Sequence, residues 1–170
     1  MNEIEYRPMT EPDVARVAEL ERICFRTPWS YRSLLGELSN DVAFYVVAVA
    51  EGKVIGYAGE WLMFDEAHMT NIAVDPGFRK HGVARRMILE LMSEGARRGA
   101  ARMTLEVREN NQTAQRLYAS MGFAFAGIRK RYYTDTGEDA FILWNDDINE
   151  TMRRNRFGGS EPIKEETENA

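Results

Sequence analysis

The chain has 170 residues, of which 44% are hydrophobic and 29% charged, and its formal net charge is −5. This length and composition are typical of one globular domain and exclude a fibrous or wholly disordered protein. The acidic balance argues against a general nucleic-acid-binding protein, which normally carries a basic excess. Cys24 is the only cysteine, so an intrachain disulfide and a cysteine-rich metal site are excluded.

The N-terminal sequence and the apolar runs predict a cytoplasmic protein that contacts no membrane. The start, MNEIEY, has neither the basic residues nor the apolar core of a secretory signal peptide. The longest apolar run, VAFYVVAVA at 42–50, is too short to cross a bilayer as a helix.

The first half of the chain predicts one strand, two helices and then three strands. Apolar residues recur at helical spacing after Thr10, whose side chain can cap a helix. Two β-rich runs flank Glu51-Gly52 and predict a hairpin. The predicted elements are a strand at 2–8, a helix after Thr10, a helix at 30–39, and strands at 42–50, 53–63 and 68–74.

The second half predicts a helix at 82–98, a strand at 102–108, a helix at 110–122 and two strands around the turn at 134–137. The strand–helix–strand unit implies a parallel pair joined by a right-handed crossover, whereas the hairpins imply antiparallel pairs. We therefore expect a single α/β (α+β) domain over residues 1–148. Its mixed, mostly antiparallel sheet has a central parallel pair and flanking helices. Residues 149–170 are polar and predict a flexible tail without chemistry.

The stretch NIAVDPGFRKHGVARRMI at 71–88 predicts a strand, a cationic turn and the start of a helix. A helix N-terminus carries unpaired N–H groups and partial positive charge, so a preceding loop with a glycine and cations fits a phosphate. Gly82 allows a ligand to approach the backbone, and positive charge comes from Arg79, Lys80 and Arg85. The alternative is an ordinary loop with solvated cations. Neither a P-loop nor a dinucleotide-binding glycine pattern occurs in the chain.

The hexapeptide Arg79-Lys80-His81-Gly82-Val83-Ala84 resembles the coenzyme A signature R/Q-x-x-G-x-G/A of the GCN5-related N-acetyltransferase (GNAT) family. Together with the order of elements, the resemblance covers residues 2–147. It implies acetyl-CoA as co-substrate, with no metal. The loop from Arg79 to Arg85 is implied to hold the pyrophosphate. The strand residues Ile72, Ala73 and Val74 are implied to hold the pantetheine arm.

Two side chains in the segment LEVRENNQTAQRLYASMGF at 105–123 suit acyl transfer to an amine. The attacking amine must lose a proton and the departing thiolate must gain one. Strand alternation places Glu106 on the face opposite Leu105 and Val107, and Tyr118 lies on the following helix. The alternatives are a solvated strand glutamate and a core tyrosine.

The same segment is similar to one branch of the family, the RimI-type ribosomal-protein alanine N-acetyltransferases. The shared residues are L-E-V-R, an asparagine at the next helix start and L-Y-x-x-x-G-F. The resemblance implies that Glu106 accepts the proton, that Tyr118 donates one and that Asn111 contacts coenzyme A.

The sequence RKRYYTDTGEDA at 129–140 is shared with RimI-type enzymes and with archaeal and eukaryotic protein N-terminal acetyltransferases. By this likeness the hairpin and the loop at 24–30 flank the amine, and the substrate-binding side chains are Trp29, Tyr132 and Tyr133. Strand aromatics without a binding role are the alternative for the tyrosines.

The expected function is acetylation of a protein N-terminal α-amine, above all the N-terminal alanine of a small-subunit ribosomal protein. Direct nucleic-acid binding is not expected. Two alternatives stay open: acetylation of a small-molecule amine, and a non-catalytic coenzyme A-binding module. The peptide-covering hairpin argues against the first, and the presence of both Glu106 and Tyr118 argues against the second.

Overall fold

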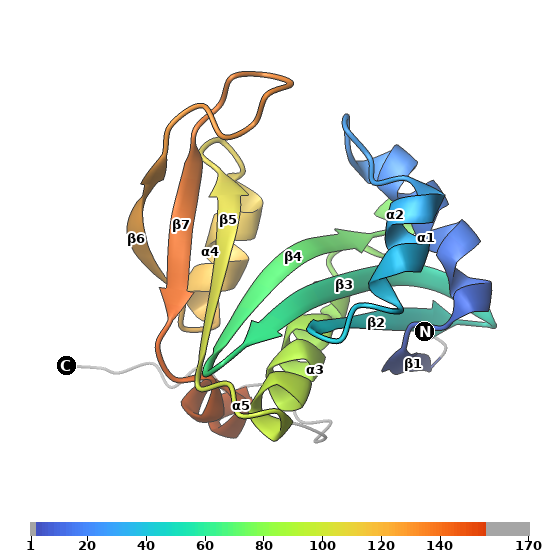
Figure 1. Cartoon of the computed structure of the whole chain (residues 1–170), viewed down its shortest axis with the longest axis horizontal. Helices are drawn as coiled ribbons and strands as arrows, with labels where there is room; N and C mark the ends of the chain where they lie inside the picture. The colour runs from blue at the N-terminus through green and yellow to red at the C-terminus, as the bar shows by residue number, and fades with distance from the viewer. Residues whose placement is uncertain (1–2, 156–170) are drawn as a thin grey trace.

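Seven strands form one sheet in a computed structural model that describes residues 3–155 (Figure 1). The strand order is β1-β2-β3-β4-β5-β7-β6. Neighbouring strands are antiparallel except for β4 and β5, which are parallel. The strands are β1 (Ile4–Pro8), β2 (Ala43–Ala50), β3 (Lys53–Met63), β4 (Glu66–Val74), β5 (Arg102–Arg108), β6 (Ala124–Arg129) and β7 (Ala140–Asn145). The expected fold class is confirmed.

Helices cover both faces of the sheet (Figure 1). They are α1 (Val14–Cys24), α2 (Tyr31–Glu37), α3 (Val83–Arg97), α4 (Gln112–Ser120) and α5 (Ile148–Asn155). One buried cluster joins α1 and α2 to one face, and a second joins α3 and α4 to the other. The residues of β2 and β3 are therefore buried almost continuously rather than alternately. No helix in the range 3–155 is long and apolar enough to cross a membrane.

The β5 strand alternates between the core and the opposite face, as its sequence predicts. Met103, Leu105 and Val107 are buried in the cluster with α3 and α4. Glu106 and its neighbours two residues away project from the other face, where they are partly exposed.

The parallel pair in the middle of the sheet is short. Residues 66–68 of β4 pair with 102–104 of β5, whereas β4 continues to Val74 and β5 to Arg108. Beyond the paired residues the two strands diverge (Figure 1). Each stays paired with its other neighbour, β3 or β7. The facing edges of β4 and β5 therefore offer backbone N–H and C=O groups to an extended ligand.

The first residues of the segment predicted to be a flexible tail, 149–170, are helical. Residues 149–155 belong to α5, which packs against α3. Ile148 and Thr151 are buried, and the Thr151 hydroxyl donates to the carbonyl of Met121 at 3.2 Å. Burial of one face thus stabilises α5, a helix that its polar composition does not predict. Residues 156–170 lie outside the described part of the chain.

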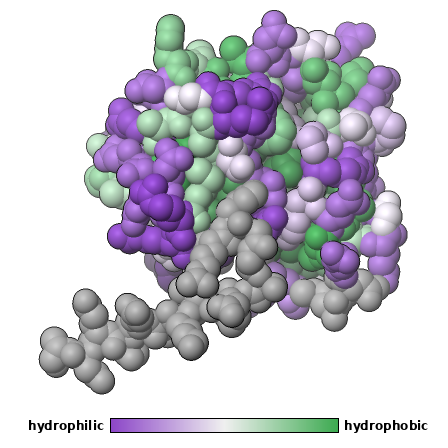
Figure 2. Space-filling view, turned by 90° about the horizontal axis from the view of Figure 1, so that it is seen from below, coloured by the Kyte–Doolittle hydropathy of each residue, from purple (hydrophilic) through white to green (hydrophobic). Residues whose placement is uncertain are grey.

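Seen from below, hydrophobic residues are scattered among hydrophilic ones on the surface of the molecule (Figure 2).

A buried carboxyl group joins α1 to the sheet. Glu21 is 1% exposed and accepts hydrogen bonds from the Tyr57 hydroxyl, the Asn71 amide at 2.6 Å and the Trp29 backbone N–H at 3.2 Å. Burial raises the pKa of Glu21 from 4.5 to about 7, although the hydrogen bonds from Trp29 and Asn71 lower it.

We expect Glu21→Gln to flatten the pH dependence of stability between about pH 4.5 and 7. The folded protein keeps a proton that the unfolded chain releases in this range, so the stabilisation is present below pH 4.5 and lost as the pH rises through 7. The gap between the two pKa values corresponds to at most ~3.5 kcal/mol. Urea unfolding at pH 5 and pH 8 measures the difference. Glu19→Gln, at an exposed position of the same helix, should keep the wild-type slope; parallel slopes for Glu21→Gln and the wild type would contradict the assignment.

Candidate active site

Glu106 lies at the point where β4 and β5 diverge, and three strands position its carboxylate. Its Oε2 is 2.6 Å from Nε2 of His68 on β4, and its Oε1 is 3.2 Å from Nε of Arg129 at the end of β6. The Glu106 side chain is 9% exposed, so these two contacts replace most of its hydration. His68 was not singled out by the sequence, and it is the last β4 residue paired with β5.

The surroundings of Glu106 favour the ionised carboxylate. Burial raises its pKa, but the hydrogen bond with His68 and the positive charge of Arg129 outweigh burial, so the pKa lies below its ordinary value. The carboxylate is thus ready to accept a proton at neutral pH. A lowered pKa also makes it a weaker base.

Tyr118 is held on α4 with its ring buried and its hydroxyl free. The ring is 5% exposed and packs edge-to-face on Phe123, with the ring centres 5.8 Å apart. The hydroxyl makes no hydrogen bond with any residue in the range 3–155. Burial, with a smaller contribution from Tyr133, raises the pKa of Tyr118 above its ordinary value. The phenol therefore stays protonated and can donate a proton.

The loop before α3 has the backbone conformation of an anion site. Gly82 is the N-cap of α3 with φ +76°, a left-handed conformation that favours glycine, and no side chain caps the first turn. A Cβ atom at Gly82 would meet no atom within 4 Å, so the space beside the backbone is open. The N–H groups of Val83 and Ala84 therefore face an accessible region with partial positive charge.

The cations near this loop have different surroundings. Arg79 donates through Nε to the Val74 carbonyl at 3.1 Å, whereas Arg85 donates to Ser120 Oγ at 2.7 Å and so links α3 to α4. Lys80 and His81 are exposed and pair with no other residue of the described chain. Lys80 can therefore contact an anion without first breaking a hydrogen bond or an ion pair.

Three further predicted cofactor contacts lie on the unpaired edge of β4, at Ile72, Ala73 and Val74. Asn111, the fourth, is the N-cap of α4 and accepts a hydrogen bond from the Ala114 backbone N–H at 3.2 Å. Capping alone explains an asparagine at this position. Its contact with coenzyme A stays a prediction.

The predicted substrate-binding residues come from two loops at one end of the molecule. The loop between α1 and α2 and the hairpin loop between β6 and β7 stand on opposite sides of the diverging strands (Figure 1). Trp29, in the first loop, donates its backbone N–H to Glu21. Tyr132 and Tyr133, in the hairpin, pack edge-to-face with ring centres 5.1 Å apart, and the guanidinium of Arg108 lies 4.0 Å from the Tyr133 ring centre.

A row of polar contacts runs from α2 across β2, β3 and β4 to Glu106. We call its members the polar strip: Glu37, Tyr45, Trp61, His68 and Thr70. Trp61 lies edge-on to His68, with ring centres 6.5 Å apart, and donates its indole N–H to Glu37 at 2.7 Å. Strand alternation places His68 and Thr70 on the face of Glu106, but only the register of β4 against β5 brings His68 into contact with it.

A family model for the acetyltransferase (GNAT) family matches residues 13–123. This range includes β4, the α3 loop, Glu106 and Tyr118. The chain belongs to the GNAT acetyltransferase family.

Several relatives of this GNAT chain carry a specific name. The [Ribosomal protein bS18]-alanine N-acetyltransferase of Escherichia coli (strain K12) is 35% identical over 133 residues, which cover 77% of this chain and 89% of the relative. The N-alpha-acetyltransferase RimI of Mycobacterium tuberculosis is 37% identical over 144 residues, which cover 81% and 89%. The crystal structure of the E. coli ribosomal-protein-S18-alanine N-acetyltransferase matches with a TM-score of 0.76 and 32% identity, covering 84% of this chain and 92% of that one.

The fold is also that of Arabidopsis thaliana NAA60 in complex with acetyl-CoA. The TM-score is 0.77 at 18% identity, with 84% of this chain and 97% of that chain covered. At this identity the likeness shows the fold alone. Among the described residues of the GNAT chain, no group of three or more His, Cys, Asp or Glu side chains could hold a metal ion.

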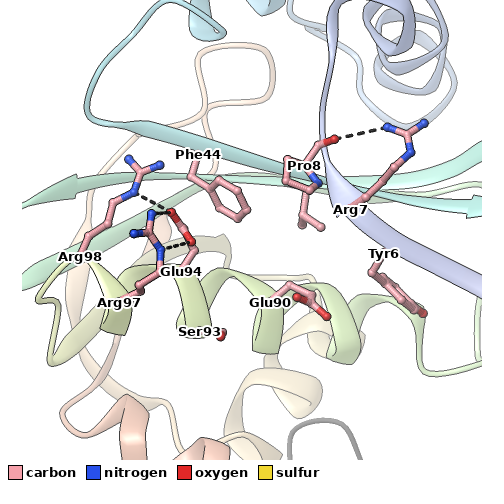
Figure 3. A pocket seen from close by; sticks show the side chains of 10 residues that line it. Tyr6, Arg7, Pro8, Phe44, Glu90, Ser93, Glu94, Arg97 and Arg98 are labelled. Atoms are coloured by element: carbon pink, nitrogen blue, oxygen red, sulfur yellow. Dashed lines mark hydrogen bonds and ion pairs between the residues drawn. The ribbon is translucent and has the colours of Figure 1, made fainter.

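Two surface cavities lie away from Glu106. One, of about 490 Å³, is bounded by β1, β2 and α3, and there Glu94 forms salt bridges with Arg97 and Arg98 (Figure 3). The other, of about 430 Å³, lies between the end of α4 and α5. Neither is lined by Glu106 or by a residue of the polar strip.

Proposed function

We propose that the chain transfers the acetyl group of acetyl-CoA to the α-amine of a protein N-terminus, and that its substrate is the N-terminal alanine of a small-subunit ribosomal protein. The names of relatives that align over about four fifths of the chain support this substrate. The observation that carries the proposal is the opening between β4 and β5, with the Glu106–His68 pair at its start. Such a substrate implies action in the cytoplasm.

The residues at the α3 loop fit the pyrophosphate of coenzyme A. The uncapped first turn of α3, the open space beside Gly82 and the unpaired Lys80 together offer N–H groups and positive charge. The edge of β4 at 72–74 pairs with no residue of β5 and fits the amide groups of the pantetheine arm, because both can form strand-like hydrogen bonds. The Val74 carbonyl on this edge accepts from Arg79. An acetyl thioester held this way lies between the two strands, toward Glu106.

Glu106 removes the proton that the amine loses during attack. An α-amine has an ordinary pKa of ~7.7–8, compared with ~10.4 for a lysine side chain, so the neutral α-amine costs about 3 kcal/mol less at neutral pH. A carboxylate assisted by His68 is sufficient to remove the proton of an α-amine. Tyr118 protonates the departing thiolate, since its buried phenol stays protonated over the physiological range.

The test compares two peptides with acetyl-CoA. One begins with a free alanine, and the other is blocked at its N-terminus and carries a free internal lysine. We expect kcat/KM to be at least tenfold higher for the alanine peptide, measured as thiol release. A free polyamine serves as the third substrate. Higher kcat/KM for the lysine peptide or the polyamine would replace this proposal with a small-amine or side-chain acetyltransferase, and absence of transfer to all three would favour a non-catalytic module.

A further inference from the structure

Glu37, at the C-terminal end of α2, is a half-buried carboxylate held entirely by neutral donors. The Tyr45 hydroxyl donates to Oε2 at 3.1 Å and the Trp61 indole N–H donates to the same oxygen at 2.7 Å. Its Oε1 makes no hydrogen bond within residues 3–155, and it is not sealed from solvent. One oxygen is therefore fixed and the other is available.

Unlike Glu37, Glu106 and the carboxylates of the β6–β7 hairpin each have a cationic partner. The pairs are Glu106 with Arg129, Asp135 and Glu138 with Arg108, and Asp139 with Lys130. Glu37 has no such partner in the described chain. An ionised carboxylate with one free oxygen and no counter-ion attracts a cation from outside the protein.

The position of Glu37 excludes the reacting amine itself as this cation. Trp61 and His68 both lie between Glu37 and Glu106 in the polar strip. An extended peptide advances by ~3.3–3.6 Å per residue, so the second residue can extend its side chain along the strip while the α-amine of the first reaches Glu106. The hydrogen bonds from Tyr45 and Trp61 hold the carboxylate in place beforehand, which lowers the entropy lost on binding.

We propose that Glu37 binds the cationic side chain of an arginine or lysine at the second residue of the substrate, and so determines which N-termini are acetylated. This inference rests on the proposed function and adds a requirement at the residue after the acetylated one. Glu37 is a specificity residue in this account, whereas proton transfer belongs to Glu106 and Tyr118.

The test uses three peptides that differ only at the second position, beginning Ala-Arg, Ala-Gln and Ala-Glu. With the wild type we expect kcat/KM for Ala-Arg to be about tenfold above Ala-Gln, chiefly through KM, with Ala-Glu lowest. The preference should decrease as salt is raised. Glu37→Gln should abolish it, because the glutamine carbonyl oxygen can keep both hydrogen bonds and only the charge is lost.

Glu37→Lys should reverse the order in favour of Ala-Glu, a gain that misfolding cannot produce. Glu11→Gln removes the same charge at an exposed position before α1 and should keep the wild-type order. Equal kcat/KM for Ala-Arg and Ala-Gln with the wild type overturns the inference, and so does a full arginine preference in Glu37→Gln. In either case the proposed function stands if Ala-Gln is acetylated at its α-amine. If the proposed function itself is wrong, none of the three peptides is acetylated at its α-amine. That result differs from both outcomes that overturn the role of Glu37.

Discussion

Replacing Glu106 with glutamine should lower kcat by about 10²–10⁴-fold, the usual contribution of a general base. The amide cannot accept the proton of the amine, although it can still occupy the site between His68 and Arg129. Affinity for acetyl-CoA should change little, because the loop at 79–85 is separate in sequence and structure. Steady-state kinetics and coenzyme A titration calorimetry measure the two quantities.

The pH dependence sharpens this prediction. Because the pKa of Glu106 lies below its ordinary value, the carboxylate stays ionised from pH 6 to 9 and can accept the proton of a bound amine over this whole range. The deficit of Glu106→Gln should shrink as the pH rises and more amine is already neutral. Glu109→Gln, at an exposed position just after β5, is the matched control and should behave as the wild type. Wild-type kcat for Glu106→Gln across pH 6–9 would assign the base to another group.

Replacing Tyr118 with phenylalanine should lower kcat by about 10²-fold or more, with little effect on folding. The ring keeps its contact with Phe123, and the lost hydroxyl has no hydrogen-bond partner in residues 3–155. Since burial raises the pKa of Tyr118, the deficit should be constant from pH 6 to 9, unlike that of Glu106→Gln. Tyr6→Phe, on the distant strand β1, is the control.

An acetyl thioester of a more acidic thiol separates the role of Tyr118 from a general structural defect. A better leaving group needs less protonation, so it should recover part of the lost rate in Tyr118→Phe but not in Glu106→Gln. Equal deficits for both thioesters in Tyr118→Phe would contradict the role of proton donor.

Local sequence patterns predict the order of elements and the face of Glu106, since period-two alternation is a property of the strand itself. They do not predict the contact between His68 and Glu106, because it depends on the register of two strands about 40 positions apart in the chain. For the same reason Glu37 was not identified. Its partners Tyr45 and Trp61 come from β2 and β3, and only the packing of α2 on the sheet brings the three together.

Residue type is also ambiguous where one side chain suits two roles. Asn111 follows a strand and precedes a helix, a position that favours both capping and ligand contact, and the structure gives it the cap. Local patterns also fail to predict the α5 helix, for a different reason. Its composition is polar, and it is stabilised by two buried residues and by packing on α3 that no local pattern reveals.

The central claim is that the acetyl group goes to an α-amine, and one measurement tests it most directly. A peptide that begins with a free alanine and also contains a free lysine is incubated with the protein and acetyl-CoA, and tandem mass spectrometry locates the added group. The account predicts acetylation at the alanine nitrogen, with the lysine unmodified and with loss of the product in Glu106→Gln. Acetylation at the lysine, or unchanged product in that variant, would contradict it.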